Sequence, residues 1–162
     1  MGQTKMKPAQ ELKVLLALGE LATTWRFKWF VGEWPCHDVV LGHAANNSWD
    51  LSHELAHFRV SPKRLRNKPS FGLGSPGDRS EDLRISSKKA YELELEASLL
   101  GIMLIGRCGA PFTEQCAIAE EHTWYHKEGD EPASVVDRLR KKKLWDKHDD
   151  DVLVRVLKRI NR

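Results

Sequence analysis

The chain has 162 residues and a formal net charge of +3, with 41% hydrophobic and 30% charged residues. This length suits one compact domain and is short for two, so we expect residues 1–162 to form a single domain. The composition is that of a folded globular protein and excludes a long disordered chain. The modest net charge does not by itself indicate a nucleic-acid-binding protein.

The amino-terminal residues and the cysteines indicate a cytoplasmic protein. Residues 1–13 lack the apolar core of a signal peptide, and no apolar run approaches the ~20 residues that a membrane span requires. Cys36, Cys108 and Cys116 form no C-x-x-C pair, and an odd number of cysteines cannot all pair within one chain. We therefore expect a reducing, cytoplasmic environment and no membrane contact.

The first part of the chain is predicted to form one helix followed by a small sheet. Pro8 precedes apolar residues at helical spacing, which predicts a helix over about 9–25. Residues 26–42 are rich in aromatic and β-branched side chains, which predicts one or two short strands. The better of these strands is expected at 38–41.

A second helix is predicted over 49–60. Asn46, Asn47 and Ser48 are good amino-terminal caps for it, and Pro62 stops it. Its apolar residues lie on more than one side, so we expect this helix to be buried.

The second half of the chain is predicted to be a loop followed by helices. Residues 61–82 contain three Pro and three Gly, which predicts a long ordered loop of the kind that is often functional. Its Phe71-Gly72-Leu73-Gly74 stretch is too short for a phosphate-binding loop, and we expect it to let the loop fold back over the active site. Helices follow at about 86–107, 113–127, 132–144 and 149–160. The sequence therefore predicts a mostly helical α+β domain.

The most informative residues are His53-Glu54-Leu55-Ala56-His57, an H-E-x-x-H motif in the predicted buried helix. At 3.6 residues per turn, His53 and His57 project from one face, one turn apart, and can bind one Zn²⁺ together. Glu54 lies beside this row, where it can act as the general base on a metal-bound water. Polar side chains are costly in a buried helix unless something satisfies them, which favours a metal site over a chance match.

A carboxylate from a later helix is the expected third ligand. A catalytic zinc takes three protein ligands, and no third His follows the motif at short spacing. Glu94 has only small residues one turn away, so another helix can approach it closely, whereas Glu92 neighbours two lysines and is expected on the solvent side. Among the candidates Glu92, Glu94 and Glu96 we choose Glu94 as the third ligand. The alternative is that all three belong merely to an amphipathic surface stretch.

The H-E-x-x-H motif, followed by Glu94-Leu-Glu-Ala97-Ser98 and an apolar helix, resembles the zincin-like metallopeptidases of the ImmA/IrrE type. The resemblance covers about residues 45–105. It implies a zincin-like domain whose active-site helix carries the motif, and it places the third zinc ligand on Glu94. It also implies hydrolysis of a peptide bond in a protein or peptide substrate, and proteins of this kind are often encoded by phages or mobile elements.

Two other functions are compatible with the sequence. A catalytically silent zincin-fold protein could act by interaction alone, for example as a phage-encoded modulator of a host factor, although the retained Glu54 favours catalysis. A nucleic-acid-associated protein could use the basic residues at 63–68. His122 and His126 form another pair one turn apart, which suits either an exposed helix face or a second site. His43 and Tyr91 could line the active site. The oligomeric state is not predicted.

Overall fold

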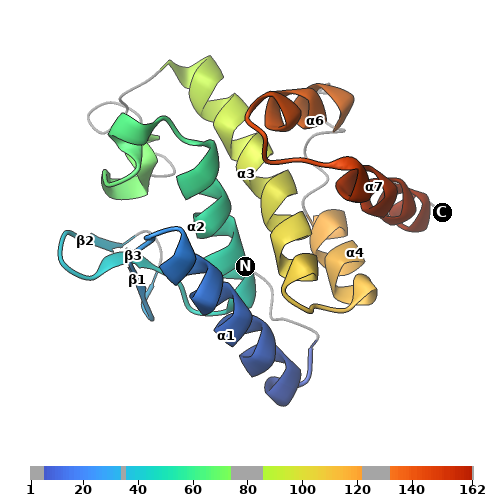
Figure 1. Ribbon diagram of the computed structural model, residues 1–162, viewed down its shortest axis with the longest axis horizontal. Helices are drawn as coiled ribbons and strands as arrows, with labels where there is room; N and C mark the ends of the chain where they lie inside the picture. Colours follow the sequence, from blue (N-terminus) through green and yellow to red (C-terminus); the bar gives the residue numbers. More distant parts are fainter. Residues whose placement is uncertain (1–5, 34–35, 74–85, 122–131, 162) are drawn as a thin grey trace.

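The computed structural model describes residues 6–33, 36–73, 86–121 and 132–161, and Figure 1 shows their arrangement. The helices are α1 (Pro8–Thr24), α2 (Ser48–Val60), α3 (Ser87–Arg107), α4 (Phe112–Glu121), α6 (Pro132–Lys141) and α7 (Lys147–Ile160). The strands are β1 (Trp29–Phe30), β2 (His37–Asp38) and β3 (Gly42–Ala44), and two short 3-10 helices span Lys63–Leu65 and Pro69–Gly72. The predicted mostly helical α+β fold with a small sheet is confirmed. His122 and His126, and residues 74–82 of the predicted loop, lie outside the described residues.

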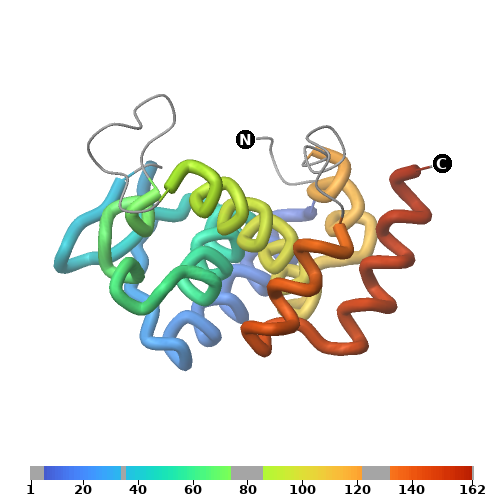
Figure 2. The backbone as a smooth tube through the Cα atoms, turned by 90° about the horizontal axis from the view of Figure 1, so that it is seen from above, coloured from blue at the N-terminus to red at the C-terminus, as the bar shows by residue number. Residues whose placement is uncertain are grey.

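Helices α2 and α3 lie side by side at the centre of the molecule and run in opposite directions (Figures 1 and 2). Helix α1 and the sheet lie on one side of this pair, and α4, α6 and α7 lie on the other. Twelve residues of α3 are buried, in an unbroken run from Leu95 to Ile105 preceded by Leu93. A helix buried on all sides can present functional side chains to its neighbours on more than one face.

Local interactions fix the start of α2. The Asn47 side chain accepts a hydrogen bond from the backbone N–H of Asp50, as the predicted cap requires. The Glu11 carboxylate of α1 accepts hydrogen bonds of 2.6 Å from both the backbone N–H and the hydroxyl of Ser48. A carboxylate at this end of a helix is also favoured by the helix dipole. Helix α1 therefore holds the first turn of the helix that carries the H-E-x-x-H motif.

A glycine in α3 allows α2 to come close. A Cβ atom placed on Gly101 would lie 3.2 Å from the Trp49 ring and 3.3 Å from the Cα of His53. A side chain at this position would be in tight contact with α2, and a branched one would need the two helices to move apart. The glycine therefore helps to set the distance between α3 and the helix turn that carries His53.

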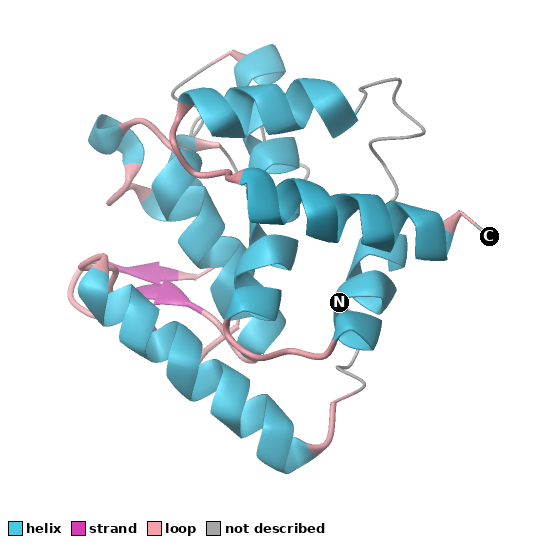
Figure 3. Ribbon diagram, turned by 45° about the vertical axis from the view of Figure 1, so that its right-hand side comes forward, coloured by secondary structure: helices cyan, strands magenta, loops and turns pink. Residues whose placement is uncertain are grey.

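The sheet is small, and one of its strands differs from the prediction (Figure 3). Strand β3 lies in the middle, parallel to β1 and antiparallel to β2. The predicted strand at 38–41 is wrong, because only Asp38 belongs to a strand and residues 39–41 form a turn. The Asp38 carboxylate accepts hydrogen bonds from the backbone N–H groups of Val40 and Leu41. These bonds form an Asx turn, although the β-branched residues of this segment favour a strand. Val39 and Val40 are consequently exposed.

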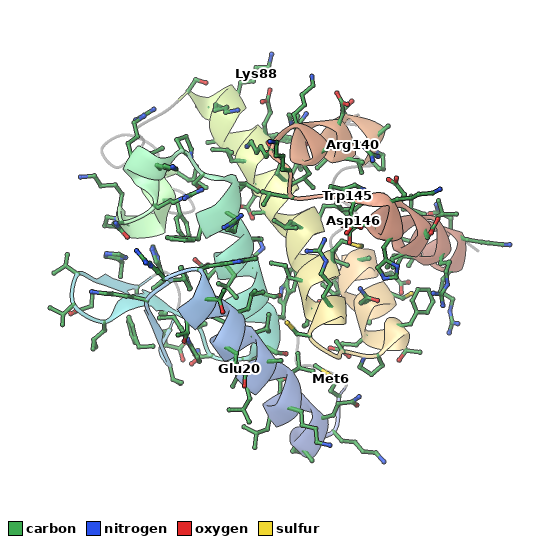
Figure 4. The ribbon with its side chains drawn as sticks, in the orientation of Figure 1. Met6, Glu20, Lys88, Arg140, Trp145 and Asp146 are labelled. Carbon is green, nitrogen blue, oxygen red and sulfur yellow. The ribbon has the colours of Figure 1, made fainter. Side chains whose placement is uncertain are left out.

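The carboxyl-terminal helices pack against α3 through its far side. Arg107 of α3 forms an ion pair with the buried Asp149 of α7. Figure 4 shows Trp145 and Asp146 in the link between α6 and α7, where the Trp145 indole N–H donates to Asp150 and Asp146 caps α7. None of the described helices combines the length and the apolar character needed to cross a membrane.

Candidate metal centre

Helix α2 presents the two histidines of the motif on one face. Their rings are 4.7 Å apart between centroids and nearly perpendicular. The His57 side chain is 5% exposed and that of His53 is 19% exposed. The helical spacing that predicted a shared ligand face therefore produces two imidazoles side by side at the surface of the core.

Glu94 of α3 meets both histidines. One carboxylate oxygen lies 3.1 Å from Nε2 of His53, and the other lies 2.8 Å from Nε2 of His57. These are hydrogen-bond distances, somewhat shorter than the roughly 3.4 Å between two atoms that bind a tetrahedral zinc at about 2.1 Å, so a small separation of the groups admits a common metal ion. Within the described residues, His53, His57 and Glu94 are the one group of three such side chains whose ligand atoms lie within 4.8 Å of one another.

Small residues explain why Glu94, rather than its neighbours, reaches the histidines. Ala97 and Ser98, which lie one turn along α3, are almost fully buried. Together with Gly101 they leave no bulky side chain on this face of α3, so that α2 can pack closely against it. The small-residue argument from the sequence therefore selected the glutamate that the structure brings to the histidine pair.

The other two candidate glutamates point elsewhere. Glu92 lies 4.0 Å from Lys89 on its own helix, near the end of α3 where Lys88 projects outward (Figure 4). Glu96 is fully buried on another face of α3, where it forms ion pairs with Arg138 of α6 and with Lys142 just after α6. Neither carboxylate contacts the histidines of α2, so neither belongs to the candidate metal centre.

Glu54 is placed as a proton acceptor beside the two histidines. It is 6% exposed, and no hydrogen bond from another described residue reaches its carboxylate. Burial raises the pKa of Glu54 to about 7, although the nearby His53 lowers it, and Glu94 adds a smaller rise. A bound divalent cation would favour the charged form and lower this pKa again. Without a cation, the Glu54 carboxylate can take up and release a proton near neutral pH.

Aromatic packing orients the histidine rings. The Nδ1 atoms of His53 and His57 are buried and have no hydrogen-bond partner among the described residues. Instead, the Phe71 ring stacks on His57 at 5.3 Å, and the Trp49 ring lies 5.4 Å from His53. Phe71 has a backbone φ of 53°, a left-handed conformation that costs energy for a bulky residue. The loop after α2 thus folds back onto the motif, as predicted, but the contribution of Phe71 itself was not foreseen.

His43 lies behind this contact and does not reach the three candidate ligands. Its ring is sandwiched between Phe27 and Phe71, and its Nε2 atom is 3.2 Å from the carbonyl oxygen of Arg66. Burial lowers the pKa of His43 to about 4, so the ring is neutral at physiological pH. His43 is therefore a packing residue that supports the loop carrying Phe71. Tyr91 lies one turn before Glu94 on α3 and is half-buried.

The donor set of this centre fits a catalytic zinc. Two imidazoles and one carboxylate are borderline donors of the kind that zinc accepts, and three protein ligands leave a fourth position for substrate or water. The half-exposed Glu94 side chain keeps the group within reach of solvent.

Comparisons with known protein families, curated proteins and solved structures find no match to this chain.

Proposed function

We propose that this protein is a zinc-dependent metallopeptidase that hydrolyses a peptide bond in a protein substrate in the cytoplasm. One observation carries the proposal: Nε2 atoms from two turns of α2 converge on one carboxylate of α3 beside a buried, unpaired Glu54. A glutamate next to its ligands has no use in a purely structural zinc site, which supports catalysis over binding alone. The resemblance to ImmA/IrrE-type zincins is part of the same proposal.

The residues would divide the work as follows. His53, His57 and Glu94 hold the zinc, which when bound polarises the scissile carbonyl and makes water more acidic. Glu54 accepts a proton as water attacks the carbonyl carbon. When the C–N bond breaks, Glu54 returns that proton to the departing amine nitrogen.

The experiment compares wild type with Glu54→Gln after both have been loaded with zinc. An unfolded protein mixture serves as substrate, and mass spectrometry counts the new amino termini. We expect wild type to generate new termini and Glu54→Gln to lose about 100-fold or more of that rate while retaining its zinc, because a general base contributes about that much. Equal rates for the two proteins would contradict the catalytic role of Glu54. No cleavage by zinc-loaded wild type would contradict the peptidase proposal.

A further inference from the structure

Basic residues gather in two segments of the chain, one after α1 and one from the last turn of α2 onward, and we call them together the basic surface. We define it as the cations of residues 25–28 and 59–68, two segments without a single Asp or Glu. Five of its seven cations are exposed, and the two others, Arg59 and Arg66, are half-buried. Its members are Arg26, Lys28, Arg59, Lys63, Arg64, Arg66 and Lys68.

Aromatic and cation–π contacts join the two segments. The Arg59 guanidinium lies 4.6 Å above the Trp25 ring, at the point where α1 ends. The Phe27 and Phe58 rings pack edge to face, with their centroids 5.1 Å apart. The Arg66 guanidinium lies over the Phe58 ring, 5.1 Å from its centroid. These contacts place Arg59 against the 25–28 segment, and Arg66 against the Phe58 ring that packs on Phe27.

Arg59 and Arg66 are held close together, with no counter-ion among the residues that the structure describes. An Nη atom of Arg66 donates to the Arg59 carbonyl at 3.4 Å, and neither guanidinium forms an ion pair with a described carboxylate. The Nε atoms of both are buried and have no hydrogen-bond partner among the described residues. Burial, and then the charge of Arg59, lower the pKa of Arg66. Both side chains are half-buried, and their Nη atoms, rather than the buried Nε atoms, are the donors left for an external anion.

Residues 138–142 form another basic stretch, but its cations pair with carboxylates of the protein. Arg138 and Lys142 pair with Glu96, Arg140 pairs with Asp150, and Lys141 pairs with Asp137. Those cations are neutralised within the protein, which is the usual arrangement for a charged helix face. Among the described residues no carboxylate forms an ion pair with the cations of the basic surface, which argues for a ligand with several negative charges.

We propose that the basic surface binds the sugar-phosphate backbone of a nucleic acid. Phosphates spaced along a strand match a set of exposed cations spread over two segments, and planar guanidinium groups bind phosphate oxygens through two hydrogen bonds. The surface offers cations rather than a helix or ribbon for a groove, so recognition is independent of base sequence. This binding does not depend on the proposed peptidase activity.

The experiment measures binding of a fluorescent DNA duplex of about 20 base pairs by anisotropy, from about 0.05 M to about 0.3 M salt. We expect binding that weakens steeply with salt. The exposed pair Lys63→Gln/Arg64→Gln should weaken binding roughly tenfold at about 0.1 M salt and reduce the salt slope by about 2, because each lost phosphate contact removes about 0.9. Arg66→Gln should act in the same direction.

The matched control is Lys147→Gln/Lys158→Gln, which removes two exposed cations from α7 and should leave binding unchanged. His57→Ala should also bind DNA normally, which separates this inference from the metal centre. Absence of binding at low salt, or an equal loss in the control pair, would overturn the proposal. Equal affinity for poly-glutamate would also overturn it, because the partner would then be an acidic protein.

Discussion

Glu94 and Glu96 stand two residues apart on the same helix and meet opposite surroundings. Glu96 is fully buried and faces Arg138 and Lys142, whose charges are permanent. Glu94 is half-exposed and faces His53 and His57, which offer nitrogen lone pairs when neutral. The first carboxylate is neutralised by cations of the protein, whereas the second meets two histidine nitrogens that are themselves metal-binding groups. The two carboxylates thus differ in both burial and partners: a structural ion pair is enclosed with permanent cations, whereas a candidate metal ligand is open to solvent beside other ligand side chains.

The Glu96 cluster also connects elements far apart in the sequence. Lys142 donates to the carbonyl oxygen of Val60, which is the last residue of α2, as well as to Glu96. The ends of α2 and α6 are thereby joined to the middle of α3. We infer that Glu96 stabilises the frame in which α2 and α3 face each other, while Glu94 acts at the site that this frame creates.

The largest expected effect on stability comes from Glu96→Gln. This change leaves two cations against α3 without their carboxylate, so the free energy of unfolding should fall by about 3 kcal/mol in urea titrations. Folded Glu96→Gln should still bind zinc. The control is Arg140→Gln, which breaks the exposed pair with Asp150 and should cost less than about 1 kcal/mol. Loss of zinc from folded Glu96→Gln, with stability unchanged, would reverse the roles assigned to the two glutamates.

Gly101→Val should affect the side of α3 that carries Glu94. The valine side chain would meet Trp49 and the backbone of His53, so we expect a loss of about 2 kcal/mol in the free energy of unfolding and weaker zinc binding. Gly19→Val in α1 is the matched control, because a Cβ there meets only a Trp29 ring atom at 3.8 Å. Equal effects of the two substitutions would show that close approach at Gly101 is unimportant.

The smallest expected effect comes from Phe71→Leu, which removes the ring stacked on His57. We expect the zinc dissociation constant to rise about tenfold, the lower end of the effect of removing a group that orients a metal ligand. Isothermal titration of zinc into the apo-protein measures this change. Phe112→Leu, at the ring below Arg155, serves as the control and should leave zinc affinity unchanged. A stability loss without any change in zinc affinity would make Phe71 a packing residue only.

Local signals in the sequence were sufficient for most of the fold. Helical periodicity located α1, α2 and α3 within one or two residues, and Asn47 caps α2 as its residue type indicates. The i, i+4 spacing placed both histidines on one face, and the small residues near Glu94 pointed to the glutamate that meets them. These are properties of a single helix, so they can be seen without knowing the packing.

Features that depend on distant residues could not be predicted. Glu96 finds its partners 42 and 46 residues later, and nothing near it in the sequence indicates this. Phe71 reaches His57 through a loop with two left-handed residues, a geometry that no periodicity reveals. The strand expected at 38–41 failed for a local reason, because the Asp38 carboxylate captures the backbone N–H groups of the turn.

The most direct test of the account is the zinc content of purified wild type, Glu94→Gln and Glu92→Gln, measured by elemental mass spectrometry. The account predicts about one zinc per chain in wild type and Glu92→Gln, and almost none in Glu94→Gln, because only Glu94 completes the three-ligand set. A wild-type protein that takes up no zinc, or a Glu94→Gln protein that retains as much as wild type, would contradict the metal centre.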